Sequence, residues 1–366
     1  MTRRGRIAAA ALLLGAGLLA GCANLGYYWQ SAHGHLGILH AARPLSEWLE
    51  DPAVADTLKE RLALAQRIRR FAVTALALPD NRSYTAYADL HRPAAVWNVV
   101  AAPPYSLALR NWCFPVAGCV GYRGYYHEAD ARAEAQAQRD AGLEAAVYPV
   151  PAYSTLGWSN WLGGDPLLST FIGYPEGELA RIVFHELAHQ VLYVPGDTVF
   201  NESFASAVER LGGELWLRTE ADEAARADYA RFDARRRQFR ALTAQTRRAL
   251  QAAYDSPAAQ AQDWPAVEAM KQNAMADFRR RYSELRATWS GPRQGAYDGW
   301  VARANNALFG AQAAYDELVP AFEALFEREG RDWPRFYAAV RRIAALPADQ
   351  RQAALHLPPQ AAAPPH

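Results

Sequence analysis

The most informative segment of this chain reads Leu179-Ala-Arg-Ile-Val-Phe-His185-Glu186-Leu-Ala-His189-Gln-Val-Leu-Tyr193. Its apolar residues recur at helical spacing, which predicts an amphipathic helix. His185 and His189 are four residues apart and would project from one face of that helix, one turn apart. Two imidazoles so placed can bind one Zn²⁺ through their ring nitrogens. Glu186 lies about 100° around the helix and can reach a water beside the metal without binding the metal, which suits a general base.

A catalytic zinc site takes three protein ligands and leaves a fourth position to water. No histidine follows His189 within six residues, so a glutamate is expected as the third ligand. The chain should break at Pro195-Gly196, and a second helix can begin near Thr198. That helix carries Glu202 and Glu209, seven residues apart and on one face. The residues alone leave both glutamates open as the ligand.

The first 21 residues have the layout of a secretory signal. Arg3, Arg4 and Arg6 precede the apolar stretch 7–20, which is short for a spanning helix of about 20 residues. The stretch ends in Leu-Ala-Gly-Cys22 and is similar to a bacterial lipobox, in which cleavage precedes the cysteine and the cysteine carries acyl chains. We therefore expect residues 1–21 to be removed and Cys22 to tether the mature chain to a membrane. The alternative is a plain signal peptide or a short anchor with an incidental cysteine.

Two further cysteines, Cys113 and Cys119, lie close together in a segment that contains Pro and Gly. An exported chain meets an oxidising compartment, so a disulfide between them is expected, with two free buried thiols as the alternative. The net charge is +1, from 39 basic and 38 acidic residues. This balance offers no basic field for nucleic acid. With 51 % apolar residues, the chain is not disordered as a whole.

The pattern along the chain predicts an α+β fold with a single domain over residues 22–345. This would be the metallopeptidase domain, because it contains the expected zinc site. Residues 22–175 form its α/β part, with a small mixed sheet and one covering helix, and 176–345 form a large helical part. The expected strands cover 94–101, 120–126 and 145–150, and the expected helices include 128–140 and an antiparallel pair over 220–254 and 263–289. The Pro/Ala-rich segment 346–366 is expected to be disordered.

The segment Asn201-Glu202-Ser-Phe-Ala-Ser206 resembles the motif of the gluzincin aminopeptidases in which the glutamate is the third zinc ligand. The resemblance implies Glu202 as the metal ligand and Glu209 as a residue that orients a histidine from outside the ligand set. The chain departs from those enzymes in two ways. The interval from His189 to Glu202 is shorter, and there is no GAMEN-type segment, which recognises the free amino terminus of a substrate.

A fuller resemblance covers nearly the whole mature chain and is to a family of bacterial lipoproteins predicted to be zinc aminopeptidases. Its features here are the lipobox, the loop 112–119, the segment 152–157, the segments His-Glu-Leu-Ala-His-Gln and Asn-Glu-Ser-Phe-Ala, and Asn305-Asn306-Ala307. The resemblance implies a zinc-dependent peptidase of the aminopeptidase type that hydrolyses peptides in the cell envelope and faces the periplasm. Ala23 follows Cys22, which favours the outer membrane.

Hydrolysis of a peptide also needs a donor for the oxyanion besides the metal. Tyr153, Tyr174, Tyr193 and Tyr297 are candidates among which the sequence does not choose, and a substrate contact by Asn306 rests on the resemblance alone. Residues 148–157 predict an edge strand, which in this type of fold pairs with an extended peptide.

Two other functions remain open. One is an endopeptidase or another zinc hydrolase. The other is a lipid-anchored scaffold without catalysis, whose partner surface would be the Arg-rich helices over 220–289. The sequence leaves the oligomeric state undetermined.

Overall fold

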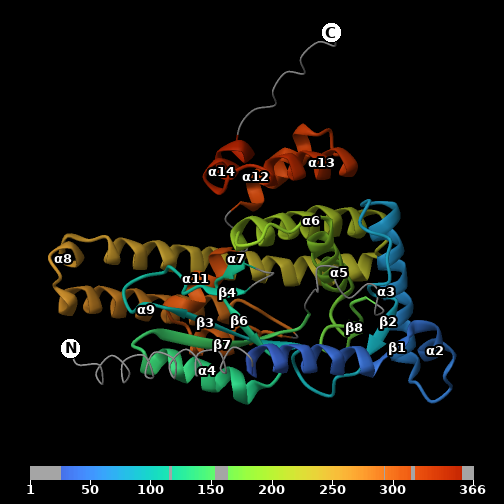
Figure 1. Cartoon of the computed structure of the whole chain (residues 1–366), viewed down its shortest axis with the longest axis horizontal. Helices are drawn as coiled ribbons and strands as arrows, with labels where there is room; N and C mark the ends of the chain where they lie inside the picture. Colours follow the sequence, from blue (N-terminus) through green and yellow to red (C-terminus); the bar gives the residue numbers. More distant parts are fainter. Residues whose placement is uncertain (1–25, 115–117, 153–163, 292, 315–317, 357–366) are drawn as a thin grey trace, which may run out of the picture.

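The structure is a computed structural model, and it describes residues 26–114, 118–152, 164–291, 293–314 and 318–356 (Figure 1). The expected signal peptide, Cys22 and the last ten residues therefore lie outside the described residues. Within the described part, no helix is both long and apolar enough to cross a bilayer. The molecule combines small β-sheets with a large helical region, so the predicted α+β class is confirmed.

The sheet nearest to the candidate site is antiparallel and has the strand order β6-β3-β7. Its strands are β3 (Val96–Ala102), β6 (Arg123–Tyr125) and β7 (Glu144–Val150). Every residue of β3 is buried, because helices cover both faces of the sheet. Helix α4 (Glu128–Asp140) packs on one face, and α11 (Asn306–Ala314) packs on the other. Among the described residues, β7 pairs only with β3, so its other edge is unpaired.

The sequence predicts one small mixed sheet, but the described strands form three separate sheets. A second sheet has the order β1-β2-β8 and contains both antiparallel and parallel pairs, and β4 and β5 form a separate hairpin. These strands are only two or three residues long: β1 (Ala42–Pro44), β2 (Ala86–Ala88), β8 (Leu167–Leu168), β4 (Trp112–Phe114) and β5 (Gly118–Val120). Pro103 and Pro104 follow β3 directly and have no N–H group to donate, so β3 cannot be extended. This is one reason why the strands are divided among separate sheets.

Helices before β2 complete this part of the molecule. Residues 26–41 are helical and are followed by α2 (Leu45–Glu50) and α3 (Asp56–Thr74). Leu62, Ala65 and Ile68 of α3 are fully buried in the main core. The apolar spacing of α3 in the sequence therefore corresponds to its buried face.

The β4–β5 hairpin holds the disulfide between Cys113 and Cys119, which lie directly opposite each other in the ladder. Gly118 in this hairpin has a φ of +72°, a backbone conformation that favours glycine. An added Cβ at Gly118 would lie 2.5 Å from the backbone N of Gly196. The hairpin thus packs closely against the turn between the two helices that carry the predicted metal ligands.

Those two helices are α5 (Glu176–Val191) and α6 (Thr198–Thr219), and they pack extensively against each other. Next comes the long antiparallel pair α7 (Glu223–Tyr254) and α9 (Trp264–Ala287), which the sequence predicted; α8 (Pro257–Gln260) joins them. Asp222, Ser256 and Asp263 accept hydrogen bonds from the first-turn N–H groups of these three helices. Phe239, Phe278 and neighbouring aromatic rings fill the interface of the pair.

The remaining helices are α10 (Asp298–Ala302), α12 (Val319–Arg328), α13 (Trp333–Ala344) and α14 (Ala348–His356). The helices α12 to α14 gather at the side of α6 in Figure 1. The expectation that residues 346–366 are disordered is wrong for residues 348–356, which form α14, and residues 357–366 lie outside the described residues. Leu355 is fully buried there, and Arg351 forms an ion pair with Asp197 at 2.6 Å. These contacts stabilise a segment whose Ala, Gln, Arg and Leu residues also favour a helix.

Candidate metal centre

The turn between α5 and α6 brings the two helices together at the candidate site. Asp197 caps α6 by accepting a hydrogen bond from the N–H of Phe200. The side-chain amide of Asn201 bonds both backbone groups of Val194, accepting from its N–H and donating to its C=O at 2.8 Å each. The neighbouring residue Glu202 is therefore presented toward α5 from the first turns of α6.

His185, His189 and Glu202 form a buried cluster of possible metal ligands. The two Nε2 atoms lie 3.2 Å apart. The Glu202 Oε2 atom lies 3.4 Å from Nε2 of His185 and 3.7 Å from Nε2 of His189. A tetrahedral zinc ion bonded at about 2.0–2.1 Å separates its ligand atoms by about 3.3–3.4 Å. The donor set and its spacing therefore fit zinc.

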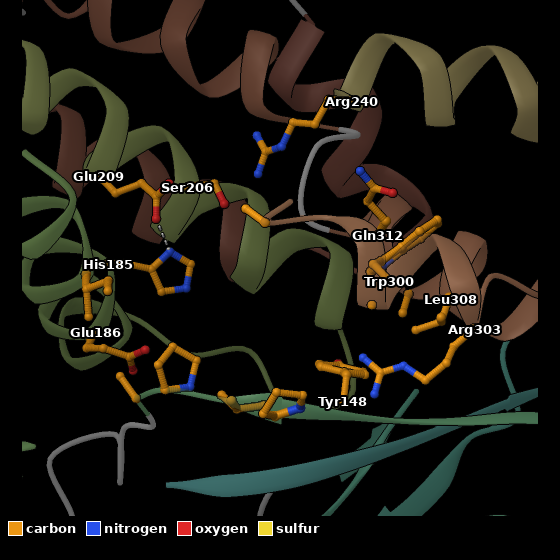
Figure 2. Close-up of a pocket in the computed structure, with 18 residues that line it drawn as sticks. Tyr148, His185, Glu186, Ser206, Glu209, Arg240, Trp300, Arg303, Leu308 and Gln312 are labelled. Carbon is orange, nitrogen blue, oxygen red and sulfur yellow. Dashed lines mark ion pairs between the residues drawn. The ribbon is translucent and has the colours of Figure 1, made fainter. Parts of the chain in front are cut away.

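Glu209 lies on the other side of His185. Its Oε2 atom is 2.8 Å from Nδ1 of His185, so the carboxylate can fix the ring with Nε2 toward the ligand cluster. Its Oε1 atom accepts a hydrogen bond from the Arg181 guanidinium. Figure 2 shows the Glu209–His185 contact at one wall of a cavity. The structure thus places Glu202 at the ligand cluster and Glu209 behind it.

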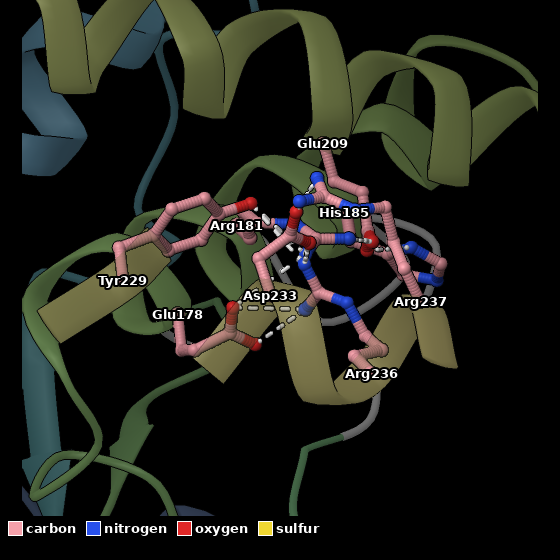
Figure 3. Close-up of polar contacts among 8 residues, drawn as sticks. All are labelled: Glu178, Arg181, His185, Glu209, Tyr229, Asp233, Arg236 and Arg237. Atoms are coloured by element: carbon pink, nitrogen blue, oxygen red, sulfur yellow. Dashed lines mark hydrogen bonds and ion pairs between the residues drawn. The ribbon is translucent and has the colours of Figure 1, made fainter. Parts of the chain in front are cut away.

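Arg181 is the centre of a buried charge network on α5, α6 and α7 (Figure 3). Its side chain is only 4 % exposed and contacts the carboxylates of Glu178, Glu209 and Asp233. The Nη1 atom of Arg236 in α7 donates hydrogen bonds to both carboxylate oxygens of Glu178, at 2.8 and 2.9 Å. Such a network satisfies charges that would be costly to bury alone.

The pKa values of the cluster reflect these contacts. Burial opposes ionisation of Glu209, but Arg181 and the hydrogen bond from His185 outweigh it and lower the pKa of Glu209 to about 2. Burial also disfavours the charged form of His185, yet its hydrogen bonds with Glu202 and Glu209 raise the pKa of His185 well above its usual range. Burial lowers the pKa of His189 to about 4, only partly opposed by Glu202. The pKa of Glu202 is also lowered against the effect of burial, by His189 and His185, so Glu202 and Glu209 both remain ionised beside the imidazoles.

Glu186 stands at the junction of two cavities. Burial raises the pKa of the Glu186 carboxyl to about 7, although His185 acts in the opposite direction. The first cavity, of about 530 Å³, extends toward α7, α10 and α11, and the second, of about 290 Å³, extends toward β3 and the N-terminal helix. His185, Glu186, Val150 and Ala152 line both cavities. A ligand could therefore pass the ligand cluster along the end of β7.

The other residues singled out by the sequence are not all at this junction. Tyr193 lines the second cavity together with Glu202. Tyr174 lies at the edge of the main core, and Tyr297 stacks on Phe239 with ring centroids 4.1 Å apart. Neither Tyr174 nor Tyr297 lines the two cavities. Tyr153 lies outside the described residues.

Asn305 and Asn306 organise the start of α11. Asn305 accepts from the N–H of Leu308, and the Asn306 amide donates to the carbonyl oxygens of Pro103 and Pro104. Asn306 is fully buried and also accepts a hydrogen bond from Tyr254. The structure therefore does not bring Asn306 to the cavities, where the resemblance suggested a substrate contact.

Several cavity residues escaped the sequence reasoning. Tyr122 and Asn98 line the second cavity, and Arg240 and Arg303 line the first. Burial, together with Glu202, raises the pKa of Tyr122 well above its usual range. These residues come from distant segments and carry no local motif. A signal was present only for Tyr148, which lies in the predicted edge strand and lines the first cavity.

Comparison with known proteins gives one informative result. No curated protein and no solved structure shows significant similarity to the chain. A family model described as "Putative aminopeptidase" matches residues 26–355, which is nearly the whole described chain. The match includes both helices of the ligand cluster and the strands that line the cavities. The chain therefore belongs to this aminopeptidase family.

Proposed function

We propose that the protein is a zinc-dependent peptidase, of the aminopeptidase type as its family description says, with a gluzincin-like site. The observation that carries the proposal is the spacing of 3.2, 3.4 and 3.7 Å among the ligand atoms of His185, His189 and Glu202. Such spacing suits one tetrahedral cation. Glu186, beside this cluster and outside it, supplies the base that hydrolysis needs.

Bound zinc supplies Lewis acidity toward water and toward the scissile carbonyl. Glu186 removes a proton from the attacking water and later passes it to the leaving amine. Glu186 lines both cavities beside the ligand cluster, so its carboxylate is placed to exchange a proton with a group bound there. Tyr122 and Tyr193 line the second cavity and are candidate hydroxyl donors for the oxyanion.

The unpaired edge of β7 supports a peptide as the substrate. Tyr148, Val150 and Ala152 line the first cavity, and this segment leads directly to Glu186. An extended peptide can add to such an edge by main-chain hydrogen bonds. Recognition of this kind depends little on side-chain identity and holds the scissile bond beside the catalytic carboxylate.

The decisive experiment is a digest of a peptide library read by mass spectrometry. We expect the wild-type protein to cleave peptides, the metal-stripped protein to be inactive, and added Zn²⁺ to restore cleavage. Glu186→Gln removes the base and no ligand, so it should retain zinc and lose turnover by about 10²–10⁴-fold. Failure of zinc-loaded wild-type protein to cleave any peptide would overturn the proposal.

Endopeptidase action is the second candidate. The cavities extend to both sides of Glu186, and among the described residues the only lining carboxylates are Glu186, Glu202 and Glu209, which the proposed mechanism already uses, so none remains to hold a free α-amine. Peptides with a blocked amino terminus separate the two modes. An aminopeptidase leaves them intact, and an endopeptidase cleaves them.

We further propose that Cys22 is lipidated and that the protein faces the periplasm from the outer membrane. The helix over 26–41 begins four residues after Cys22. It exposes Tyr28, Trp29 and Leu36, with exposed fractions of 41 %, 74 % and 54 %. Aromatic and aliphatic side chains next to a lipid anchor suit contact with the membrane interface.

A further inference from the structure

The first cavity is lined by both carboxylates and arginines. The ligand-cluster end holds Glu186 and Glu209, which are the only carboxylates among its described lining residues. Arg240 of α7 and Arg303 at the end of α10 belong to the other walls, and Figure 2 shows both side chains directed into the cavity. The cavity is therefore suited to a ligand with a negative group at some distance from the reacting bond.

Arg303 is distinctive among the arginines of this region. No hydrogen bond or ion pair connects its guanidinium to another described residue, and the side chain is exposed. In contrast, the buried arginines Arg181 and Arg236 have carboxylate partners. Arg303 and Tyr148 of the edge strand both line the first cavity, and Figure 2 shows the Arg303 guanidinium directed toward the side of the cavity where Tyr148 lies. A peptide lying on β7 would thus pass an available guanidinium.

The remainder of the cavity is mostly apolar. Pro149 and Pro151 of the β7 segment face Trp300, Leu308 and other side chains of α10 and α11. Apolar walls with a few charged groups are typical of sites that fix a small ligand in one orientation. In such surroundings a guanidinium binds a carboxylate strongly, because its planar N–H groups match the two oxygens.

We propose that this cavity binds a carboxylate of the peptide substrate, with Arg303 as the direct contact. The carboxylate can be the C-terminal group of a short peptide or the side chain of an Asp or Glu residue. This inference rests on the proposed function, because it places the scissile bond at Glu186. The substrate class is therefore peptides that carry a carboxylate near the cleaved bond. This carboxylate lies on the side of the bond that faces Arg303.

Binding to the full-length, zinc-loaded Glu186→Gln protein tests the proposal without turnover. Isothermal calorimetry compares three otherwise identical peptides: one with a free C-terminal carboxylate, its C-terminal amide, and the amide with one interior Ala replaced by Glu. We expect at least one carboxylate peptide to bind about 10- to 100-fold more tightly than the plain amide. Tight binding of the free acid identifies the C-terminal group, and tight binding of the Glu-containing amide identifies an acidic side chain.

Variants of Arg303 show whether this residue makes the contact. In the same background, Arg303→Gln should abolish the difference between acid and amide while leaving binding of the amide unchanged, and Arg303→Lys should retain part of it. The matched control is Arg248→Gln, which removes the same charge at an exposed position of α7 that does not line the cavity. Equal affinities for all three peptides, or a preference that survives Arg303→Gln, would overturn the proposal.

Cleavage by the otherwise wild-type protein distinguishes this inference from the proposed function. Arg303→Gln should raise KM for the preferred peptide about 10- to 100-fold with little change in kcat, because the contact is made equally in the ground and transition states. Cleavage without any preference for a carboxylate rejects the inference alone. An Arg303-dependent preference in binding without any cleavage rejects the proposed peptidase function and leaves the inference standing.

Discussion

Arg181 on α5 and Glu209 on α6 form a buried ion pair, and the second oxygen of the same carboxylate lies 2.8 Å from Nδ1 of His185. A guanidinium thus acts on the candidate metal centre through one intervening carboxylate. It holds Glu209 ionised, and Glu209 in turn fixes the orientation of the imidazole. The packing of α5 against α6 and the geometry of the site therefore depend on the same contact.

Replacing Arg181 should be strongly destabilising. Arg181→Leu leaves the carboxylates of Glu178, Glu209 and Asp233 without their shared buried partner, and loss of one member of a buried pair typically costs about 3–5 kcal/mol. Urea unfolding measures the change. The control Arg237→Leu also removes a contact to Asp233, but Arg237 is 67 % exposed, so we expect a change within about 1 kcal/mol. Equal effects of the two substitutions would contradict this account.

The two glutamates of α6 should respond differently to substitution. Glu202→Gln replaces a proposed ligand oxygen, so zinc occupancy and peptidase activity should be lost together. Glu209→Gln leaves the three ligands in place and should weaken zinc binding or activity by about 10–100-fold, as loss of a ligand-orienting group does. Metal analysis after dialysis against a series of zinc buffers measures both. If Glu202→Gln keeps stoichiometric zinc and Glu209→Gln loses it, then Glu209 is the ligand and Glu202 is the orienting residue.

The contact between the disulfide hairpin and the α5–α6 turn can be tested with two glycines. Gly118→Ala introduces a positive-φ alanine and places its Cβ 2.5 Å from the backbone N of Gly196. Gly142→Ala introduces a positive-φ alanine with nothing within 4 Å of its Cβ. In both variants the free energy of unfolding should fall by about 1 kcal/mol, because alanine disfavours a positive φ. In Gly118→Ala it should fall further, because the added Cβ would meet the backbone of Gly196. Thermal unfolding of the two variants measures the difference, and equal losses would argue against a close contact.

Lipidation can be tested directly. Cells that express the full chain with Cys22→Ser should release the protein from the membrane fraction, whereas the unchanged chain should incorporate labelled fatty acid and partition into detergent. Density-gradient separation then distinguishes the outer from the inner membrane. Cys22→Ser protein that remains fully in the membrane fraction would reject the anchor, and unchanged protein found only in the inner membrane would reject the outer-membrane assignment.

The sequence predicted those parts of the molecule that depend on local spacing. The α5 and α6 helices, the α7–α9 pair and the strand that became β7 all have a clear apolar period or clear turn residues. The interval between His185 and His189 also fixes their common face once the segment is a helix. These features depend on residues close together in the chain.

Other parts depend on contacts that no local pattern encodes. Arg181 occupies an ordinary position in the α5 sequence, and its carboxylate partners come from α5, α6 and α7. Tyr122 and Arg303 reach the cavities only because β6 and α10 pack beside β3 and α7. The α14 helix exists through tertiary contacts such as the burial of Leu355. The prolines on both sides of that segment suggested disorder for the whole of 346–366, although the Ala, Gln, Arg and Leu residues of α14 favour a helix.

The contact of Asn201 with Val194 has a consequence for the order of folding. It closes a loop of only seven residues, and the proposed ligands His185 and Glu202 are 17 positions apart in the chain. Closing so short a loop costs little chain entropy compared with joining β2 to β8, which are about 80 residues apart. The α5–α6 hairpin is therefore a unit of low contact order, and we expect it to form early. The hairpin that carries the candidate metal ligands should thus assemble before the small sheets are complete.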